Sequence, residues 1–277
     1  MATFNAAIGS VFGLAVLPFR AMNPWLAMIV VSVLTGLLML AVFRWTSNQE
    51  GIRRAKEAIK AHLLELRLYK DNMAQQMRSQ GRILRANGRY ILHAFRPMLV
   101  MIVPVMLLLI QINLWFGSRP LAPGETAILK VKLAAGRSAL ASDVSIEAPP
   151  GVAVETPPLR IEEEREIDWR LRAAAPAPGA YDLTLKLGPD SFTKSLQIGG
   201  SRLAPISNVR PGASILDQIF NPGEKPLPRA LPVESVEVDH PERRLPLLGL
   251  RLHWLVAYFA LSIVFGFALK GVFKVEI

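Results

Sequence analysis

The sequence predicts an α-helical membrane protein with three transmembrane helices and a cytoplasmic helical hairpin, plus an inserted extracytoplasmic antiparallel β-sandwich. Three observations predict this fold class: uncharged apolar runs long enough to cross a bilayer, a strongly basic connection between the first two runs, and a long connection with alternating strands. The chain has 277 residues, a net charge of +10 and 51% hydrophobic residues. It contains no cysteine, which excludes disulfides and Cys-based metal sites.

Three runs are free of Asp, Glu, Lys and Arg: Trp25–Phe43, Pro97–Phe116 and Leu252–Leu269. A hydrocarbon core of about 30 Å needs about 20 helical residues, so the first two runs fit well. The third is shorter and spans with the help of Arg251 and Lys270 at its ends, whose charged groups can reach the interface. Aromatic side chains near the ends predict an interfacial belt; they are Trp25, Trp115, Phe116, Trp254 and Tyr258.

The amino-terminal stretch, residues 1–22, differs from these runs because it is too short to span and contains Pro18. It lacks the basic start and the small-residue cleavage site of a secretory signal. We expect an amphipathic helix that lies in the membrane interface and leads through Asn23 and Pro24 into the first span. An uncleaved signal-like segment is the alternative.

Charge predicts the orientation of the spans. The connection Arg44–Arg96 carries twelve basic and four acidic residues, a surplus of eight, whereas Gly117–Leu250 carries 16 basic and 17 acidic residues. By the positive-inside rule, the first connection is cytoplasmic and the second is extracytoplasmic. The amino terminus is then outside and the carboxyl terminus is cytoplasmic. Since topology accounts for the basic character, a nucleic-acid partner is not expected.

The basic connection, residues 46–96, predicts a coiled-coil hairpin. One apolar stripe has helical spacing; its members are Ile52, Ala55, Ile59, Leu63 and Leu66. Ser47 or Asn48 is the expected N-cap. A second, less regular stripe runs toward the second span; it contains Met73, Met77, Leu84, Tyr90 and Ile91. The two stripes are expected to face each other.

These features resemble the YidC/Oxa/Alb insertase superfamily, and within it the short three-span branch of archaeal YidC-like proteins and the third subunit of the endoplasmic-reticulum membrane complex. The residues that carry the resemblance are "NPWLAMIVVSVLTGLLMLAVFRWTSNQEGIRRAKEAIKAHLLELRLYKDN" and "QGRILRANGRYILHAFRPMLVMIVPVMLLLIQINLWF". Together with the amino-terminal helix and the last span they cover about half of the chain, by layout rather than by a strict motif. The resemblance implies a hydrophilic groove among the spans that eases the insertion of client segments.

The candidate groove residues are the polar side chains on the spans: Ser32, Thr35, Gln111, Asn113 and Ser262. Arg44 and Arg96 would flank its cytoplasmic mouth, and Pro104 would kink the second span. The first span has no basic residue, in contrast to insertases that place one inside the groove. Alternatively, the hydroxyls bond only to their own helix, and the amides only hold helices together.

The connection after the second span predicts a β-sandwich of immunoglobulin-like size over residues 117–200. Its strands alternate polar and apolar residues and are separated by Gly/Pro turns; they read "TAILKVKL", "DVSIEA", "EIDWRLRA", "AYDLTLKLG" and "SFTKSLQIG". Trp169 is the expected core residue, with ligand binding as the alternative. The acidic run Glu162–Glu164 is expected to be a solvated turn rather than a cation site. Residues 201–250 predict a Pro-rich linker, and residues 251–277 the third span and a cytoplasmic tail.

No catalytic motif is present: four histidines are scattered, and no phosphate loop or nucleophile elbow occurs. We therefore expect no enzyme, no catalytic residues, no cofactor and no metal. Two functions remain open: an insertase or intramembrane chaperone of the inner (cytoplasmic) membrane of a prokaryote, or a non-catalytic scaffold or receptor. The expected partners are membrane lipids and nascent or client membrane proteins, together with an extracytoplasmic protein bound through residues 120–200.

Overall fold

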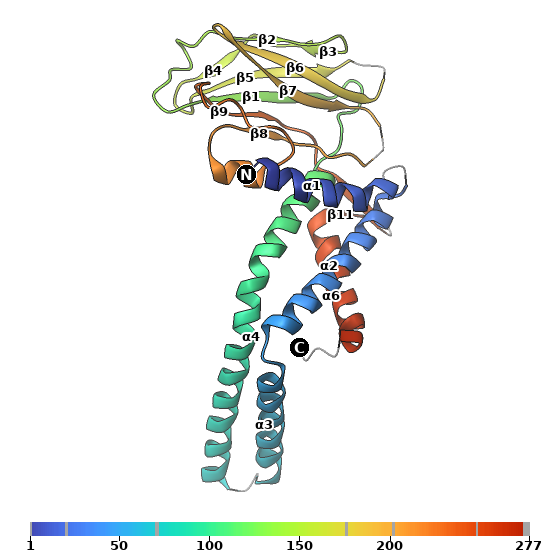
Figure 1. The fold of residues 1–277 in the computed structure, drawn as a ribbon, viewed down its shortest axis with the longest axis vertical. Helices are drawn as coiled ribbons and strands as arrows, with labels where there is room; N and C mark the ends of the chain where they lie inside the picture. Colours follow the sequence, from blue (N-terminus) through green and yellow to red (C-terminus); the bar gives the residue numbers. More distant parts are fainter. Residues whose placement is uncertain are drawn as a thin grey trace. The chain divides into compact units, whose positions relative to one another are not determined.

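A computed structural model describes residues 2–19, 22–69, 72–174, 177–200, 203–247 and 249–273. Three helices in this part of the chain are long and apolar enough to cross a membrane, so the predicted long apolar helices are confirmed (Figure 1). They are α2 (Pro24–Thr46), α4 (Met73–Phe116) and α6 (Trp254–Phe273). The predicted cytoplasmic tail, residues 274–277, lies outside the described residues.

The chain divides into two compact units: Met28–Leu108 with Leu255–Ile277, and Met1–Ala27 with Leu109–Trp254. The first unit contains a helical hairpin in which α3 (Gln49–Leu68) lies alongside the first half of α4 (Figure 1). The Asn48 side chain caps α3 by accepting a hydrogen bond from the Gly51 N–H. Asn72 plays the same part for α4, accepting from the Gln75 N–H at 3.1 Å. Both caps satisfy amides that a helix leaves without partners.

The apolar seam of the hairpin differs from the predicted one. On α3, Ile52 and Ala55 are buried as expected, but Leu63 is 52% exposed. On α4 the predicted stripe is wrong except at Tyr90, since Met73, Met77, Leu84 and Ile91 are all exposed. The side of α4 that is buried or half-buried instead follows a heptad spacing with residues of mixed size and polarity; it contains Ser79, Ile83, Ala86, Tyr90 and His93.

A polar cluster explains why the seam follows this register. The Ser79 hydroxyl donates to Oε2 of Glu65 at 2.8 Å, and His62 Nδ1 lies 3.2 Å from the same oxygen. Arg82 completes the cluster at 3.5 Å. The hydrogen bond from Ser79, together with the nearby His62, lowers the pKa of Glu65 and so favours its charged form. A polar group inside a seam fixes register more strongly than exposed methionines can.

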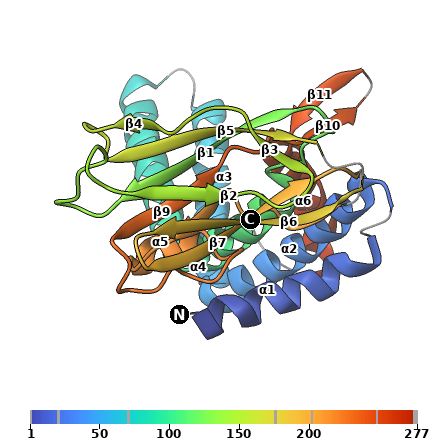
Figure 2. The same cartoon turned by 90° about the horizontal axis from the view of Figure 1, so that it is seen from above.

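The second unit begins with α1 (Ala2–Val16) and the short helix η1 (Leu17–Phe19). The backbone of α1 approaches the end of α4 (Figure 2): a Cβ at Gly9 would lie 3.8 Å from Oε1 of Gln111, and one at Gly13 would lie 3.8 Å from Cζ2 of Trp115. The outward face is also apolar, with Val11 70% and Leu14 69% exposed. The helix contains no charged residue, so the predicted amphipathic character is weak.

The rest of this unit holds antiparallel β-sheets. The larger sheet has the strand order β3 (Val152–Val154), β5 (Glu166–Ala173), β1 (Thr126–Leu133), β9 (Val233–Val238) and β8 (Val209–Pro211), and β4 (Leu159–Ile161) also pairs with β5. The smaller sheet has the order β2 (Val144–Glu147), β6 (Gly179–Leu187) and β7 (Asp190–Ile198). We call β1 to β9 with their connections the β domain. Trp169 is 3% exposed within one core that both sheets share, as predicted.

Residues 201–250 are not a linker, because their described part continues the β domain. β9 pairs with β1 along Leu129–Leu133, and Val233, Val236 and Val238 enter the shared core. The helix α5 (Ile215–Phe220) lies between β8 and β9. Sequence reasoning missed these elements because Pro211 and Pro232 lie at their ends and the strands are short.

Lys194 on β7 secures the same segment to the smaller sheet. Its side chain is fully buried, donates to the carbonyl of Ser207 at 2.7 Å and forms an ion pair with Glu224. Burial lowers the pKa of Lys194, and the carboxylate of Glu224 acts in the opposite direction. A charge at such a depth is tolerated only when it is paired.

The chain enters and leaves the β domain through neighbouring backbone segments. The Arg119 N–H donates to the carbonyl of Pro241 at 2.9 Å, and the Arg243 N–H donates to that of Gly117 at 3.0 Å. Beyond this crossing, β10 (Arg244–Leu247) pairs with β11 (Leu250–His253), which continues directly into α6. The Trp25 indole donates to the Pro246 carbonyl at 2.7 Å, so this hairpin also holds the start of α2.

Candidate functional site

Two of the predicted groove residues, Thr35 and Ser262, come together between α2 and α6 around Tyr258. Ser32 and Thr35 lie three positions apart on one face of α2. The Tyr258 side chain on α6 lies near those of Thr35 and Ser262, and Ser32 lies one turn from Thr35 on α2. We call Ser32, Thr35, Tyr258 and Ser262 the hydroxyl cluster.

The cluster is enclosed and only partly satisfied. Ser32 is 0% and Thr35 4% exposed. Thr35 donates to the carbonyl of Val31 at 2.8 Å, as the alternative of a bond within the helix requires. The hydroxyls of Ser32 and Ser262 are buried without a well-formed hydrogen bond to any described group. An unsatisfied polar group inside hydrocarbon costs several kcal/mol. A further hydrogen bond to either of these two oxygens would therefore be stabilising.

Close packing of α2 on α6 encloses the cluster. A Cβ at Gly36 would lie 3.6 Å from the backbone nitrogen of Gly266 and 3.8 Å from the carbonyl oxygen of Ser262. Small residues let membrane helices approach in this way. Few side-chain atoms therefore separate the two backbones next to the hydroxyls.

Tyr258, which the sequence predicts in the interfacial belt, is only 2% exposed. Its spacing of four from Ser262 was the available signal, because residues four apart share a helix face. Trp115, Phe116 and Trp254 are buried as well, and Trp25 hydrogen-bonds to Pro246. The predicted belt is therefore largely wrong, because most of its members pack inside the protein.

Gln111 and Asn113 lie on the part of α4 that belongs to the second unit. Gln111 is 3% exposed, and its Oε1 has no hydrogen-bond partner among the described residues. Asn113 is exposed and lines a cavity beside the β domain. Both amides therefore belong to a different compact unit from the hydroxyl cluster.

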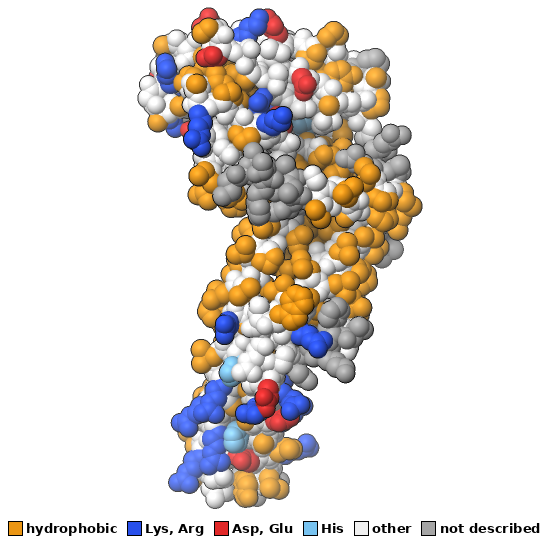
Figure 3. All heavy atoms as spheres, in the orientation of Figure 1, with side chains coloured by type: hydrophobic (Ala, Val, Ile, Leu, Met, Phe, Trp, Pro, Cys, Tyr) orange, Lys and Arg blue, Asp and Glu red, His pale blue; other side chains and the backbone are white. Residues whose placement is uncertain are grey.

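Arg44 and Arg96 are both exposed at the surface of their helices. A cavity of about 380 Å³ at the base of the hairpin is lined by other basic groups, Arg54 and Arg89, together with His93. Lys and Arg side chains gather over the hairpin, whereas hydrophobic side chains cover the helices beyond it (Figure 3). Helix α4 continues through Pro97 and Pro104, so the predicted kink at Pro104 stays a prediction.

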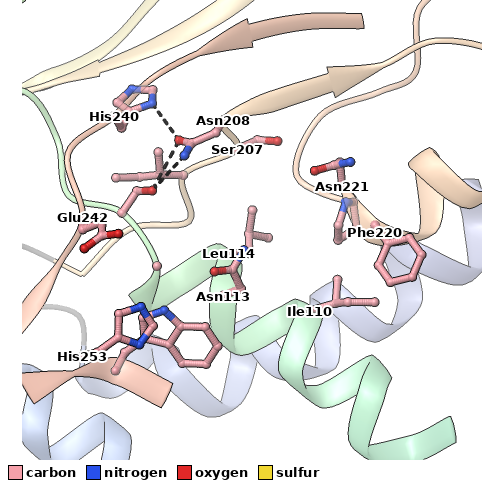
Figure 4. A pocket seen from close by; sticks show the side chains of 15 residues that line it. Ile110, Asn113, Leu114, Ser207, Asn208, Phe220, Asn221, His240, Glu242 and His253 are labelled. Atoms are coloured by element: carbon pink, nitrogen blue, oxygen red, sulfur yellow. Dashed lines mark hydrogen bonds between the residues drawn. The ribbon is translucent and has the colours of Figure 1, made fainter. Parts of the chain in front are cut away.

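The second unit holds a polar cavity of about 220 Å³ where α4 meets the β domain (Figure 4). Asn113, Asn208, Glu242 and His253 contribute polar groups to its wall. His240 is fixed there by two contacts: Nδ1 lies 3.0 Å from Oδ1 of Asn208, and Nε2 accepts from the Gln197 N–H at 3.2 Å.

Burial, together with the charge of Lys194, lowers the pKa of His240 to about 4. The imidazole is therefore neutral at pH 7 and serves as a structural hydrogen-bonding group. Within the described ranges, no three His, Cys, Asp or Glu side chains gather where they could hold a metal ion.

Comparisons with known proteins do not assign the chain to a family. No protein-family model matches the chain, and no curated protein matches it. Among solved structures, "Crystal structure of the S-layer protein SbsC domains 4 and 5" matches with 18% identity over 30% of this chain and a TM-score of 0.24. The chain spans 48% of that structure's length. A similarity this low supports no argument about fold or function.

Proposed function

We propose that the chain is a YidC-like membrane-protein insertase or intramembrane chaperone, with an extracytoplasmic β-sandwich between its second and third spans. The order of elements supports this proposal: α1, a span, a basic hairpin, a second span and a third span. The observation that carries it is the hydroxyl cluster. Ser32 lies seven residues beyond Trp25 and Ser262 eight beyond Trp254, about 10–12 Å along each helix at 1.5 Å per residue.

The hydroxyls lower the cost of bringing a polar client segment into the bilayer. A backbone or side-chain group moved alone into hydrocarbon loses its hydrogen bonds to water, at a cost of several kcal/mol. The oxygens of Ser32 and Ser262 can replace some of those bonds. In the structure α2 and α6 enclose them, so a client reaches them only when the two helices separate.

Replacing Thr35 and Ser262 by leucine is expected to reduce photocrosslinks from α2 to nascent membrane proteins severalfold, because it removes the polar surface that a client would meet. The matched control is Thr46→Leu, since Thr46 also donates to the carbonyl four residues back but lies outside the cluster. Equal crosslinking by both variants would contradict the proposal. So would cysteines at positions 32, 35 and 262 that stay closed to water-soluble thiol reagents during client insertion.

The proposed orientation places the hairpin in the cytoplasm and the β domain outside. In intact bacterial cells, an impermeant maleimide is expected to label Ser191→Cys and not Gln80→Cys; both positions are exposed and the chain has no other cysteine. Ser79 is unsuitable as a probe because it is 1% exposed. Both cysteines should react after the membrane is permeabilised. The reverse pattern in intact cells would reject the orientation and the insertase proposal with it.

The polar cavity beside the β domain favours a second function, a scaffold whose β domain binds an extracytoplasmic partner. Its wall includes the exposed side chains of Asn113 and Glu242, an amide and a carboxylate that a polar ligand or peptide could meet. Crosslinkers placed in this wall and on the hairpin separate the two functions. A specific protein captured only from the cavity would support the scaffold.

A further inference from the structure

We propose that α5 is a membrane-surface anchor, whose apolar face lies in the outer leaflet of the bilayer beside the end of α4. This inference rests on the proposed transmembrane placement of α4, and it assigns a lipid partner to the β domain itself. The ligand chemistry is the boundary between headgroups and acyl chains, which short amphipathic helices enter with their apolar face.

The face of α5 is built for such a contact. Ile215, Leu216, Ile219 and Phe220 share one side of the helix, since they are spaced by one, four and five positions. Three of them are exposed although they are large and apolar: Ile215 by 52%, Leu216 by 66% and Phe220 by 50%. Scattered apolar residues are ordinary on a protein surface, but three on one face of a six-residue helix mark an interaction site.

Polar side chains in and next to α5 bond to the backbone of the helix and of the loop before it. Ser214 caps the helix through the Asp217 N–H, and the Gln218 side chain donates to the carbonyl of Gly212 at 3.0 Å. The Asn221 amide donates to the carbonyl of Asp217 at 3.1 Å. These bonds cap both ends of α5 and tie Gln218 to the loop before it, and in this arrangement Ile215, Leu216 and Phe220 are exposed.

Contacts with α4 set the level of α5 relative to the span. Phe220, Asn221 and Pro222 line the same cavity as Ile110 and Leu114 (Figure 4). The Ile206 N–H donates to the Leu114 carbonyl at 2.8 Å, and a Cβ at Gly223 would lie 2.6 Å from Cδ1 of Leu114. The loop therefore packs directly on the last two turns of α4.

The depth that follows is that of a membrane interface. Ile110 lies six residues before the end of α4 at Phe116, about 9 Å along the helix axis. Interfacial helices bury their apolar face by about 5–10 Å below the headgroups, so α5 is at the matching level. Helix α1 contacts the same turns through Gly9 and Gly13. Its exposed Val11 and Leu14 would continue the apolar surface around α4.

The test uses the full-length protein in phosphatidylcholine–phosphatidylglycerol vesicles with a single cysteine carrying an environment-sensitive dye. Nitroxide lipids that quench at shallow or deep positions report its depth. A dye at Leu216→Cys should be quenched severalfold more than one at Ser191→Cys on β7, and more by shallow than by deep nitroxides. Asp217→Cys, on the polar side of α5, is the matched control and should be quenched less than Leu216→Cys.

A dye at Val103→Cys separates this inference from the proposed function, because Val103 is 63% exposed in the middle of the span. Deep nitroxides should quench it. If Val103→Cys is quenched but Leu216→Cys matches Ser191→Cys, the anchor is rejected and α4 still spans the bilayer. If Val103→Cys is not quenched either, the transmembrane placement and the anchor both fail.

Discussion

A fragment of residues 118–243 is expected to fold, whereas residues 120–200 alone are expected to remain unfolded. The shorter fragment ends before β9, which pairs with β1 and contributes Val233, Val236 and Val238 to the core. Each fully buried valine stabilises a fold by about 1.5–3 kcal/mol, and a domain has only about 5–15 kcal/mol in total. Circular dichroism and thermal unfolding of the two fragments will show the difference.

A third fragment of residues 118–243 carrying Val236→Asp serves as the control for the role of β9. It should lose its cooperative transition, as the short fragment does, because an unpaired carboxylate would enter the shared core. A cooperative transition in residues 120–200 would restore the shorter domain boundary that the sequence predicts. It would also mean that the larger sheet is complete without β8 and β9.

Removing the carboxylate from the Lys194–Glu224 pair is expected to lower the free energy of unfolding of the β domain by about 3–5 kcal/mol. In Glu224→Leu the ammonium group of Lys194 stays fully buried and keeps, among the described residues, only the Ser207 carbonyl as a hydrogen-bond acceptor. Urea unfolding of residues 118–243, followed by the fluorescence of Trp169, measures the loss.

The double variant Lys194→Met/Glu224→Leu tests the cause of that loss. It should recover most of the stability, because replacing both members of a buried pair by apolar residues is often neutral or stabilising. Glu147→Leu breaks the exposed pair with Lys186 and should change stability by less than about 1 kcal/mol. A double variant as unstable as Glu224→Leu would show that the shape of the side chain at position 224, rather than its charge, stabilises the β domain.

The sequence by itself determined the long apolar helices and the strands with regular patterns. Uncharged runs around Trp25–Phe43 and Pro97–Phe116 appear as helices, because a membrane helix must satisfy its backbone internally and cover itself with apolar side chains. The strand "EIDWRLRA" coincides with β5, since alternation along a strand follows directly from the geometry of the chain. Both signals are local, so a single sequence contains them.

Only the tertiary structure decided which residues meet across elements. The hairpin seam runs through Ser79 and Ala86, while Met73 and Met77 are exposed, because the register depends on Glu65 of the other helix. In the same way, β9 belongs to the core because β1 leaves an open edge for it. Tyr258 joins Thr35 because α2 and α6 pack closely at Gly36. Each of these contacts depends on a residue that is distant in sequence, so the local periodicity of one segment cannot predict it.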